Sequence, residues 1–257
     1  MRIVWLILLG LLAYVVGIAV LFPAAPVVDR LRPQLGAVAL EGVSGKLYNG
    51  VINSVRSTDD LLPLEFSNVG WTLAPQTLLS GGAGASFRFD GYGGQGEGLI
   101  ARRWNGDIAI SRFSFDAQAK ALEPLLPVPI ASFSGDLSGD IDTITLRDNL
   151  LTRFEGILNW TNAQLESPVP TSLGDVQVQI TPEGEQSHLI TLGATGGDVA
   201  MEGTVKMTQA GDFSADVLFT PSASASPAVL NGLRQMGRAD AQGRVRFVRQ
   251  GNVNRLL

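Results

Sequence analysis

The sequence has no cysteine and a single histidine, His188. Without cysteine, the chain can form no disulfide, no thiol nucleophile and no cysteine-based zinc site. One histidine excludes a metal site built from several imidazoles, and it leaves a Ser-His-Asp triad with a single candidate base. Leu189 and Ile190 follow this histidine, so we expect it on the solvent-facing side of a strand edge.

Basic residues are also scarce. Lysine and arginine number 19 against 24 aspartate and glutamate residues, and the formal net charge is −5. An acidic chain without a basic cluster is a poor partner for nucleic acid, so we expect none to bind. Three arginines near the C-terminus are predicted to guard an edge strand against aggregation, with docking of an acidic partner as the alternative: Arg244, Arg246 and Arg249.

Motifs of the common catalytic sites are missing as well. The sequence contains no G-x-S-x-G elbow, no H-E-x-x-H, no Walker A loop and no S-x-x-K. We therefore predict that the protein is not an enzyme. We expect no catalytic residue, no cofactor-binding residue and no metal ligand.

One segment does match a nucleotide-binding motif, because residues 91–96 read G-Y-G-G-Q-G. In a dinucleotide site this loop follows a strand and opens a helix, whose N-terminus binds the phosphates. Residues 97–100, Glu-Gly-Leu-Ile, are instead typical of a strand and begin with an anion. We interpret the motif as a glycine-rich hairpin or a barrel bend.

Carboxylates occur singly, and most lie beside glycine, which marks turns. We expect solvated turn residues at these positions, and the sequence alone leaves a glycosidase-type pair among them open: Asp107, Asp116, Asp136, Asp140, Asp142, Asp175, Asp198 and Asp240. Trp71, Trp104 and Trp160 are candidates for lining a ligand surface. For Trp71 and Trp160 a place in the core is the favoured interpretation, because large aromatic side chains usually fill cores.

An unbroken apolar run occupies residues 3–22, with Arg2 before it and no charge inside it. A helix of this length, at 1.5 Å per residue, covers about 30 Å, the thickness of a bilayer's hydrocarbon core. We predict a membrane anchor at residues 1–24, with the short N-terminus in the cytoplasm and the rest exported. A cleaved signal peptide is the alternative, but its small-residue site, Ala24-Ala25, is flanked by prolines.

After the anchor the chain changes character twice. Prolines at positions 23, 26 and 33 predict an extended linker over residues 25–40, because proline disfavours helix in the residue before it. Farther on, apolar and polar residues alternate, most clearly at residues 176–180, 199–207, 213–219 and 245–247. This period of two is typical of antiparallel strands with one buried and one solvated face. We therefore predict a mainly β fold, one large antiparallel sheet that is curved or barrel-like, with two short helices.

Local signals add detail to the sheet. The alternation over residues 108–115 slips by one position, which predicts a β-bulge near Ser111-Arg112. Residues 103–107, which contain Asn-Gly, and residues 209–212 predict hairpin connections.

Capping signals locate the two helices. Ser226 can cap a helix, Pro227 suits its first position and Gly237 suits its end. The residues between them therefore predict a helix with one apolar face. A weaker helical pattern covers residues 116–123 and is ended by Pro124.

The two halves of the chain resemble each other at a spacing of roughly 100 residues. Gly93-Gly94 corresponds to Gly196-Gly197, and each pair precedes two strands, a helix and further strand. We predict a duplicated β unit, with a first repeat at residues 41–148 and a second at residues 149–251. Chance similarity between two strand-rich halves is the alternative.

Several short motifs, taken in order, resemble the type II secretion system protein N family, also called general secretion pathway protein N. They are V-x-G-x-L-x-x-G at 43–50, W-x-L-x-P-x-x-L-L-x-G at 71–81, G-x-L-x-W at 156–160, L-G-D at 173–175, G-G at 196–197 and G-x-x-D-x-x-G at 237–243. Tyr48 departs from the pattern, since we expect tryptophan there. The resemblance runs from the anchor to about Gly251.

The resemblance implies a single-pass inner-membrane protein of Gram-negative bacteria whose β-domain lies in the periplasm. It implies a non-enzymatic part in the machinery that exports folded proteins across the outer membrane. Its implied partners are the inner membrane and other secretion-system proteins, such as the secretin or the inner-membrane platform. The alternative function is a membrane-anchored, lipid- or hydrophobe-binding β-groove, which predicts many inward apolar side chains left uncovered.

Overall fold

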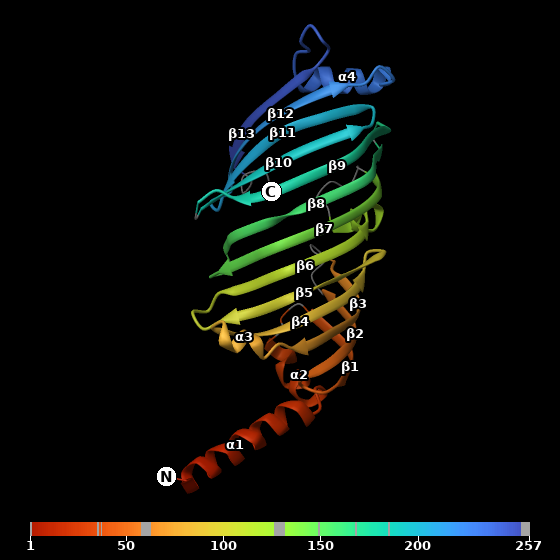
Figure 1. Cartoon of the computed structure of the whole chain (residues 1–257). Helices are drawn as coiled ribbons and strands as arrows, with labels where there is room; N and C mark the ends of the chain where they lie inside the picture. The colour runs from red at the N-terminus through yellow and green to blue at the C-terminus, as the bar shows by residue number, and fades with distance from the viewer. Residues whose placement is uncertain are drawn as a thin grey trace.

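The computed structural model describes residues 2–34, 36, 38–57, 63–125, 132–148, 150–167, 169–184 and 186–252. Thirteen strands form one antiparallel sheet in which the order of strands follows the chain (Figure 1). They are β1 (Val38–Gly45), β2 (Asn49–Ser57), β3 (Glu65–Leu73), β4 (Gly82–Gly91), β5 (Gly94–Arg103), β6 (Ile108–Gln118), β7 (Ser132–Arg147), β8 (Leu150–Ser167), β9 (Thr171–Pro182), β10 (Ser187–Gly196), β11 (Val199–Thr208), β12 (Asp212–Pro221) and β13 (Val245–Asn252). The predicted antiparallel, mainly β fold is confirmed.

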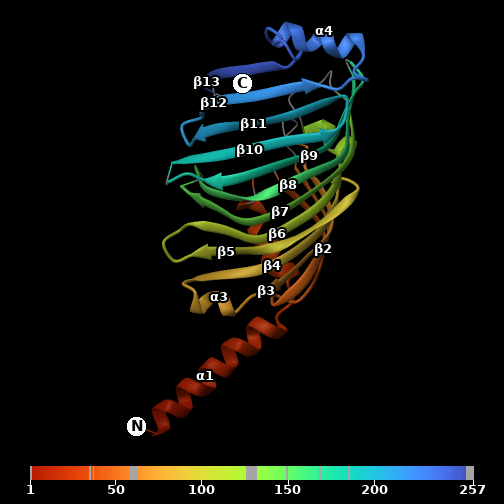
Figure 2. The ribbon, with the colours of Figure 1, turned by 45° about the horizontal axis from the view of Figure 1, so that its top comes forward.

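Helices are few and lie at the margins of the sheet. They are α1 (Arg2–Leu21), α2 (Ala25–Leu31), α3 (Gln76–Leu79) and α4 (Pro227–Met236), with 3-10 segments η1 (Arg32–Gln34) and η2 (Ala119–Leu125). α1 projects from the β1 end of the molecule, whereas α4 lies at the β13 end (Figures 1 and 2). Within the part of the chain that the structure describes, no helix combines the length and apolar character needed to cross a membrane. The anchor at residues 1–24 stays a prediction.

The backbone predicted for residues 25–40 is wrong, because α2 and η1 replace most of the extended linker. Pro26 lies in the first turn of α2, where a helix needs no N–H from proline. Ala24 is only 1% exposed, and its N–H donates to the carbonyl oxygen of Gly45 at 3.1 Å. This segment therefore packs against the end of β1.

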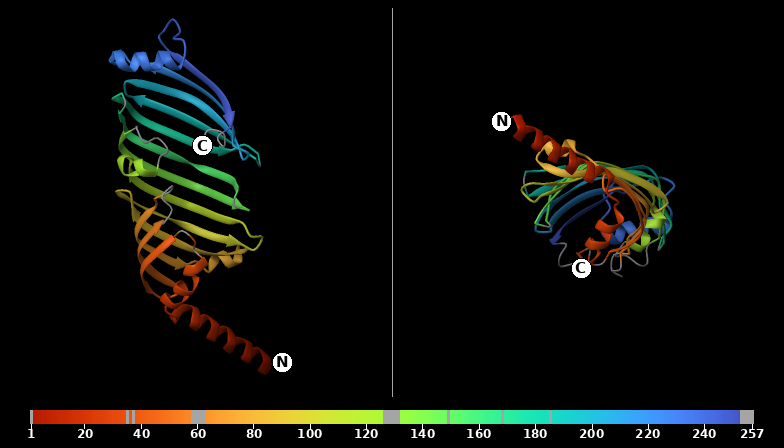
Figure 3. Two further views of the ribbon diagram at one scale, coloured as in Figure 1. Left: turned by 180° about the vertical axis from the view of Figure 1, so that it is seen from behind. Right: turned by 90° about the horizontal axis from the view of Figure 1, so that it is seen from below.

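The sheet bends along its strands into a long open trough (Figure 3). Among the described strands, β1 pairs only with β2 and β13 only with β12, apart from an isolated bridge between Val245 and Ala239. Of the two predicted forms, the barrel-like one is therefore wrong, and the sheet is curved and open. The sheet does not close into a barrel because it bends along its strands. Successive strands therefore lie in a row, which places β13 far from β1.

The predicted irregularities within the sheet are confirmed. Ser111 pairs with Leu99 and Ser114 with Glu97, so β6 contains one residue more than β5 at this point. Arg112, inside this bulge, has a φ of 51°. The two predicted hairpins connect β5 to β6 and β11 to β12, and each uses a glycine of positive φ, at positions 106 and 211.

The stronger helix prediction is confirmed and the weaker one needs correction. The Oγ of Ser226 accepts a hydrogen bond from the N–H of Val229 at 3.3 Å, and α4 ends before Gly237. The weaker helix was predicted at residues 116–123, but β6 continues to Gln118 because its residues still pair with β7. The segment that follows, η2, is a 3-10 helix that contains Pro124 instead of ending before it.

Little of this molecule is buried. Val229 and Leu233 of α4 pack on Val199 and Val245 of the sheet, and a second small cluster centres on Ala163. The solvent-accessible surface is 16497 Å². A compact protein of 27.2 kDa would expose about 10,900 Å². Much of the sheet thus has no second layer over it.

Candidate functional site

The two faces of the sheet have opposite chemistry. Directly paired residues of neighbouring strands lie on the same face, so they form rows that cross the sheet. One such row from β4 to β13 is apolar or glycine throughout: Phe89, Gly96, Phe115, Gly139, Leu158, Val178, Leu192, Gly203, Val217 and Phe247. A neighbouring row reads Ala117, Leu137, Trp160, Val176, Ala194, Met201, Phe219 and Val245.

A third apolar row lies on the other side of the first, and only its last member is charged. It contains Phe113, Ile141, Gly156, Ile180, Ile190, Val205, Ala215 and Arg249. The opposite face is largely polar, as the row Asp116, Ser138, Asn159, Gln177, Gly193, Glu202, Leu218 and Arg246 shows. The sheet is therefore amphipathic from β6 to β13.

The apolar rows line the inside of the trough. Val229 and Leu233 of α4 pack against Val245, which belongs to an apolar row. α4 and α2 lie inside the arc of the sheet in the view along the trough (Figure 3, right). We call this surface the concave face. With strands about 4.8 Å apart, thirteen strands give the trough a length of about 58 Å.

An aromatic cluster covers the part of the concave face formed by β3, β4 and β6. Phe66, Phe87, Phe89, Phe113 and Phe115 form a continuous set of ring contacts with centroids 4.7–6.3 Å apart. Glycines of neighbouring strands make room for the rings, since a Cβ on Gly96 would lie 2.5 Å from the ring of Phe89. This cluster was not predicted from the sequence, although phenylalanines spaced two apart and facing glycine-rich strands were a signal.

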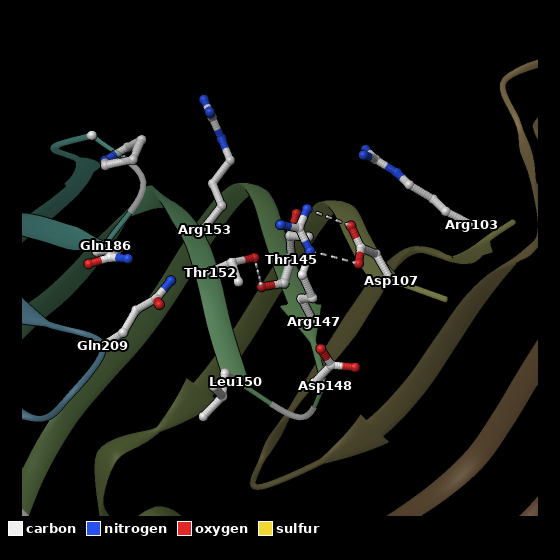
Figure 4. A pocket seen from close by; sticks show the side chains of 12 residues that line it. Arg103, Asp107, Thr145, Arg147, Asp148, Leu150, Thr152, Arg153, Gln186 and Gln209 are labelled. Carbon is white, nitrogen blue, oxygen red and sulfur yellow. Dashed lines mark hydrogen bonds and ion pairs between the residues drawn. The ribbon is translucent and has the colours of Figure 1, made fainter. Parts of the chain in front are cut away.

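A separate depression of about 390 Å³ lies at one rim of the trough (Figure 4). It forms where the turns from β5 to β6, β7 to β8, β9 to β10 and β11 to β12 lie next to one another. Its lining includes three arginines and two aspartates: Arg103, Arg147, Arg153, Asp107 and Asp148. We call it the rim depression.

Asp107 is a buried and paired carboxylate in the rim depression. It is 3% exposed, and the Nε and Nη2 atoms of Arg147 donate to its two oxygens at 3.1 Å each. The Nδ2 of Asn105 donates to it at 3.0 Å. The hydrogen bond from Arg147, followed by that from Asn105, holds the pKa of this carboxyl below its usual range. The predicted solvated turn residue is thus wrong here, because the arginine fork draws the carboxylate inward.

His188 also differs from its prediction. It is 8% exposed, on a strand that pairs on both sides, so it is neither at a sheet edge nor solvent-facing. Its Nε2 accepts a hydrogen bond from the N–H of Phe154 at 2.9 Å. Burial, and then the charge of Arg153, lowers the pKa of His188. A neutral imidazole here links β10 to the backbone of β8, at a point where β8 no longer pairs with β9.

Several of the other carboxylates accept hydrogen bonds from the backbone or lie on the polar face. Asp198, Asp175 and Asp240 each accept hydrogen bonds from backbone N–H groups, at 2.8–3.2 Å. Asp116 and Asp140 lie on the polar face opposite the concave face, which we call the convex face. Among the described residues, no group of three or more histidine, aspartate and glutamate side chains is placed to hold a metal ion.

Of Trp71, Trp104 and Trp160, two are half-buried and one is exposed. Trp71 and Trp160 are half-buried, and their Nε1–H groups donate to the carbonyl oxygens of Leu47 and Ser134 at 3.2 and 3.0 Å. Trp104 lies in the turn after β5 and is 67% exposed.

The glycine-rich motif and the C-terminal arginines have structural roles. Tyr92 and Gly93, with φ of 52° and 77°, form a two-residue turn between β4 and β5, as the hairpin interpretation predicted. Arg246 pairs with Asp216 across to β12. β13 is an edge strand and contains Arg246 and Arg249, so these two arginines lie on a sheet edge as predicted, and their guarding role stays a prediction.

Comparison with known proteins gives a consistent result. The profile of the family described as "Type II secretion system (T2SS), protein N" matches residues 36–248. The Type II secretion system protein N of Vibrio cholerae serotype O1 (strain ATCC 39315 / El Tor Inaba N16961) is 27% identical over 245 residues, covering 92% of this chain and 93% of that protein. The protein of the same name from Aeromonas hydrophila is 26% identical over 259 residues, covering 95% of this chain and 96% of that one. No solved structure matches significantly. Since the family profile covers the whole sheet except its last residues, the chain belongs to the type II secretion system protein N family.

Proposed function

We propose that this protein is a non-enzymatic, inner-membrane-anchored component of the type II secretion system, with its sheet in the periplasm. In this role it supports the export of folded proteins across the outer membrane. The observation that carries the proposal is the family match over residues 36–248, which is supported by two relatives of the same name and nearly the same length.

The N-terminal helix supports the proposed anchor. Residues 3–22 contain no charged side chain, and α1 covers nearly all of them. Several large apolar side chains of α1 are exposed without a protein layer over them, including Trp5, Leu9 and Tyr14. Exposed apolar side chains along a helix mark a contact with lipid or with another protein.

The partners we propose are the inner membrane and other secretion-system proteins, such as the secretin or the inner-membrane platform. The outer edges of β1 and β13 support contacts of this kind, because neither has a further strand of the described sheet beside it and a strand edge offers backbone N–H and C=O groups to another chain.

A deletion experiment tests the secretion role. We expect that removing the gene lowers the amount of exported protein in the medium and retains it in the periplasm, and that the full chain restores export. The control is a second plasmid that carries the same gene with a stop codon after residue 40. Normal secretion in the deletion strain, with unchanged secretin and platform assembly, would contradict a required role.

The anchor is tested separately. Residues 1–40 are fused to alkaline phosphatase, which is active only after export. We expect activity in the membrane fraction, from a polypeptide that still contains residue 2. Activity in the soluble periplasmic fraction would show cleavage near Ala24, and no activity would show the opposite orientation.

A further inference from the structure

The concave face needs an occupant that the described chain does not supply. Its three apolar rows run side by side from β6 to β13, and most of their side chains are half-buried. Contiguous apolar surface of this extent on a soluble domain marks a binding site. We propose that the concave face binds the acyl chains of phospholipids, which lie along the trough.

The chemistry of the lining favours acyl chains over a peptide. The three rows contain one charged side chain in all, Arg249 on the last strand. The strand backbone between the edges is already paired within the sheet. A peptide bound there would bury its own N–H and C=O groups without partners, which is costly. An acyl chain has no hydrogen-bonding group to satisfy.

Shape disfavours a second copy of the chain as the occupant. Two concave faces placed against each other touch at their rims and enclose a void, so the apolar rows would stay uncovered. Close packing is what makes an apolar contact favourable. Flexible chains, in contrast, adapt to a curved floor in which rings and glycines alternate, as at Phe115 and Gly139.

The dimensions of the trough fit this ligand. The hydrocarbon core of a bilayer is about 30 Å thick, so the acyl chains of one leaflet reach about 15 Å. The trough, about 58 Å long, holds such chains completely along its axis.

Position identifies a phospholipid as the source of the chains. The β1 end of the trough adjoins α1 (Figure 1). The inference rests on the proposed function in one respect, the placement of α1 in a bilayer.

Site-specific crosslinking tests this proposal in the full chain. p-Benzoylphenylalanine replaces Leu158 or Leu192 on the concave face, and Ile157 or Thr191 on the convex face as matched neighbours. Cells are grown with ³²P-phosphate to label phospholipids, and illuminated. We expect at least fivefold more phospholipid label on the chain from the two concave positions. β8 and β10 lie about 34 Å and 43 Å from β1, so contact with the bilayer itself does not account for such labelling.

Three outcomes would overturn the proposal. They are equal phospholipid labelling from both faces, a crosslink from the concave positions to another protein, and a crosslinked dimer of this chain. Loss of export in the deletion strain is measured independently, so a failure of lipid labelling would leave the proposed secretion role standing.

A charge placed in the trough gives a second measurement. Leu192→Glu is combined with the probe at Leu158, and Thr191→Glu with the same probe is the control. We expect Leu192→Glu to lower the phospholipid label at least fivefold and Thr191→Glu to leave it unchanged, with both variants unfolding at temperatures close to that of the unmodified chain. Unchanged labelling in a folded Leu192→Glu variant contradicts the proposal, and the crosslinking result stands on its own if this variant does not fold.

Discussion

At the scale of single residues, polar side chains that this structure buries complete the hydrogen bonding of nearby main chain and charge. His188 accepts from the N–H of Phe154, and Asp107 accepts from Arg147 and Asn105. Among the described residues, neither belongs to a group of side chains placed to hold a metal ion. Their burial therefore affects the stability of the strand ends. Because both side chains titrate, this contribution to stability depends on pH.

The pKa of His188 predicts a loss of stability in mild acid. Burial lowers this pKa in the folded protein, whereas the unfolded chain keeps a value of about 6.5. In mild acid, His188 therefore binds a proton in the unfolded state that it does not bind in the folded state. The stabilisation is complete above about pH 6.5 and is lost as the pH falls from there toward the folded pKa.

The measurement is the free energy of unfolding in urea at pH 7.5 and pH 5.5 for the unmodified chain and for His188→Gln. Glutamine keeps an acceptor for the N–H of Phe154 but does not titrate. We expect a smaller drop between the two pH values in His188→Gln. Because His188 is the single histidine, equal drops in the two proteins would contradict this account.

At the scale of the strand, the space available around a glycine differs between the two faces of the sheet. Gly139 lies beneath the ring of Phe115, and a Cβ there would also meet the side chain of Leu158 at 2.9 Å. Gly193 lies on the convex face, and the atom nearest to its Cβ would be the carbonyl oxygen of Met201 at 3.8 Å. The same substitution should therefore have opposite effects at the two sites.

We expect Gly139→Ala to lower the free energy of unfolding by about 1–3 kcal/mol through overpacking. Gly193→Ala should instead raise it, by up to about 1 kcal/mol, because alanine loses less backbone entropy on folding. Urea unfolding of the two variants side by side checks this. Equal effects would show that the rings of the concave face move aside at little cost.

At the scale of the helix, α4 is stabilised by its cap, Ser226, and by the packing of Val229 and Leu233 on the sheet. Ser226→Ala removes the acceptor for the N–H of Val229 and should cost about 1 kcal/mol of stability. The expected readout is faster amide hydrogen exchange in α4, with little change in β6 to β9. Ser224→Ala, in the same loop but outside the helix, is the control, and faster exchange in α4 of that variant would contradict the assignment of the cap to Ser226.

At the scale of the whole molecule, the order of elements favours the predicted duplication without testing it. The series β2 to β7 compares with β8 to β13, and in each a helix, η2 or α4, precedes the last strand. α3 has no counterpart among the described residues between β9 and β10. The sheet continues from β7 into β8 without a break, so the proposed repeats at 41–148 and 149–251 share one sheet.

An open sheet also has two edges that must not pair with other copies. β13 is one of them, and it presents Arg249 beside the exposed side chain of Val248. We expect Arg249→Val to increase self-association of the full chain in sedimentation velocity experiments, because charge on an edge strand opposes edge-to-edge pairing. Arg88→Val removes the same charge from the interior strand β4 and should leave the monomer fraction unchanged. Equal behaviour of the two variants would contradict the role of the edge.

Local sequence was sufficient for features whose cause is local. The alternation of apolar and polar residues predicted the antiparallel strands, the slip near Arg112 predicted the bulge, and Ser226 with Pro227 predicted α4, because strand faces and helix caps depend on residues a few positions apart. Other features depend on contacts between distant segments. The pairing of Asp107 with Arg147, forty positions on, and the burial of His188 beneath Phe154 needed the folded sheet. The direction in which the sheet bends also depended on the folded structure. Because the sheet bends toward its apolar face and stays open, the alternating pattern produces a trough lined by apolar side chains.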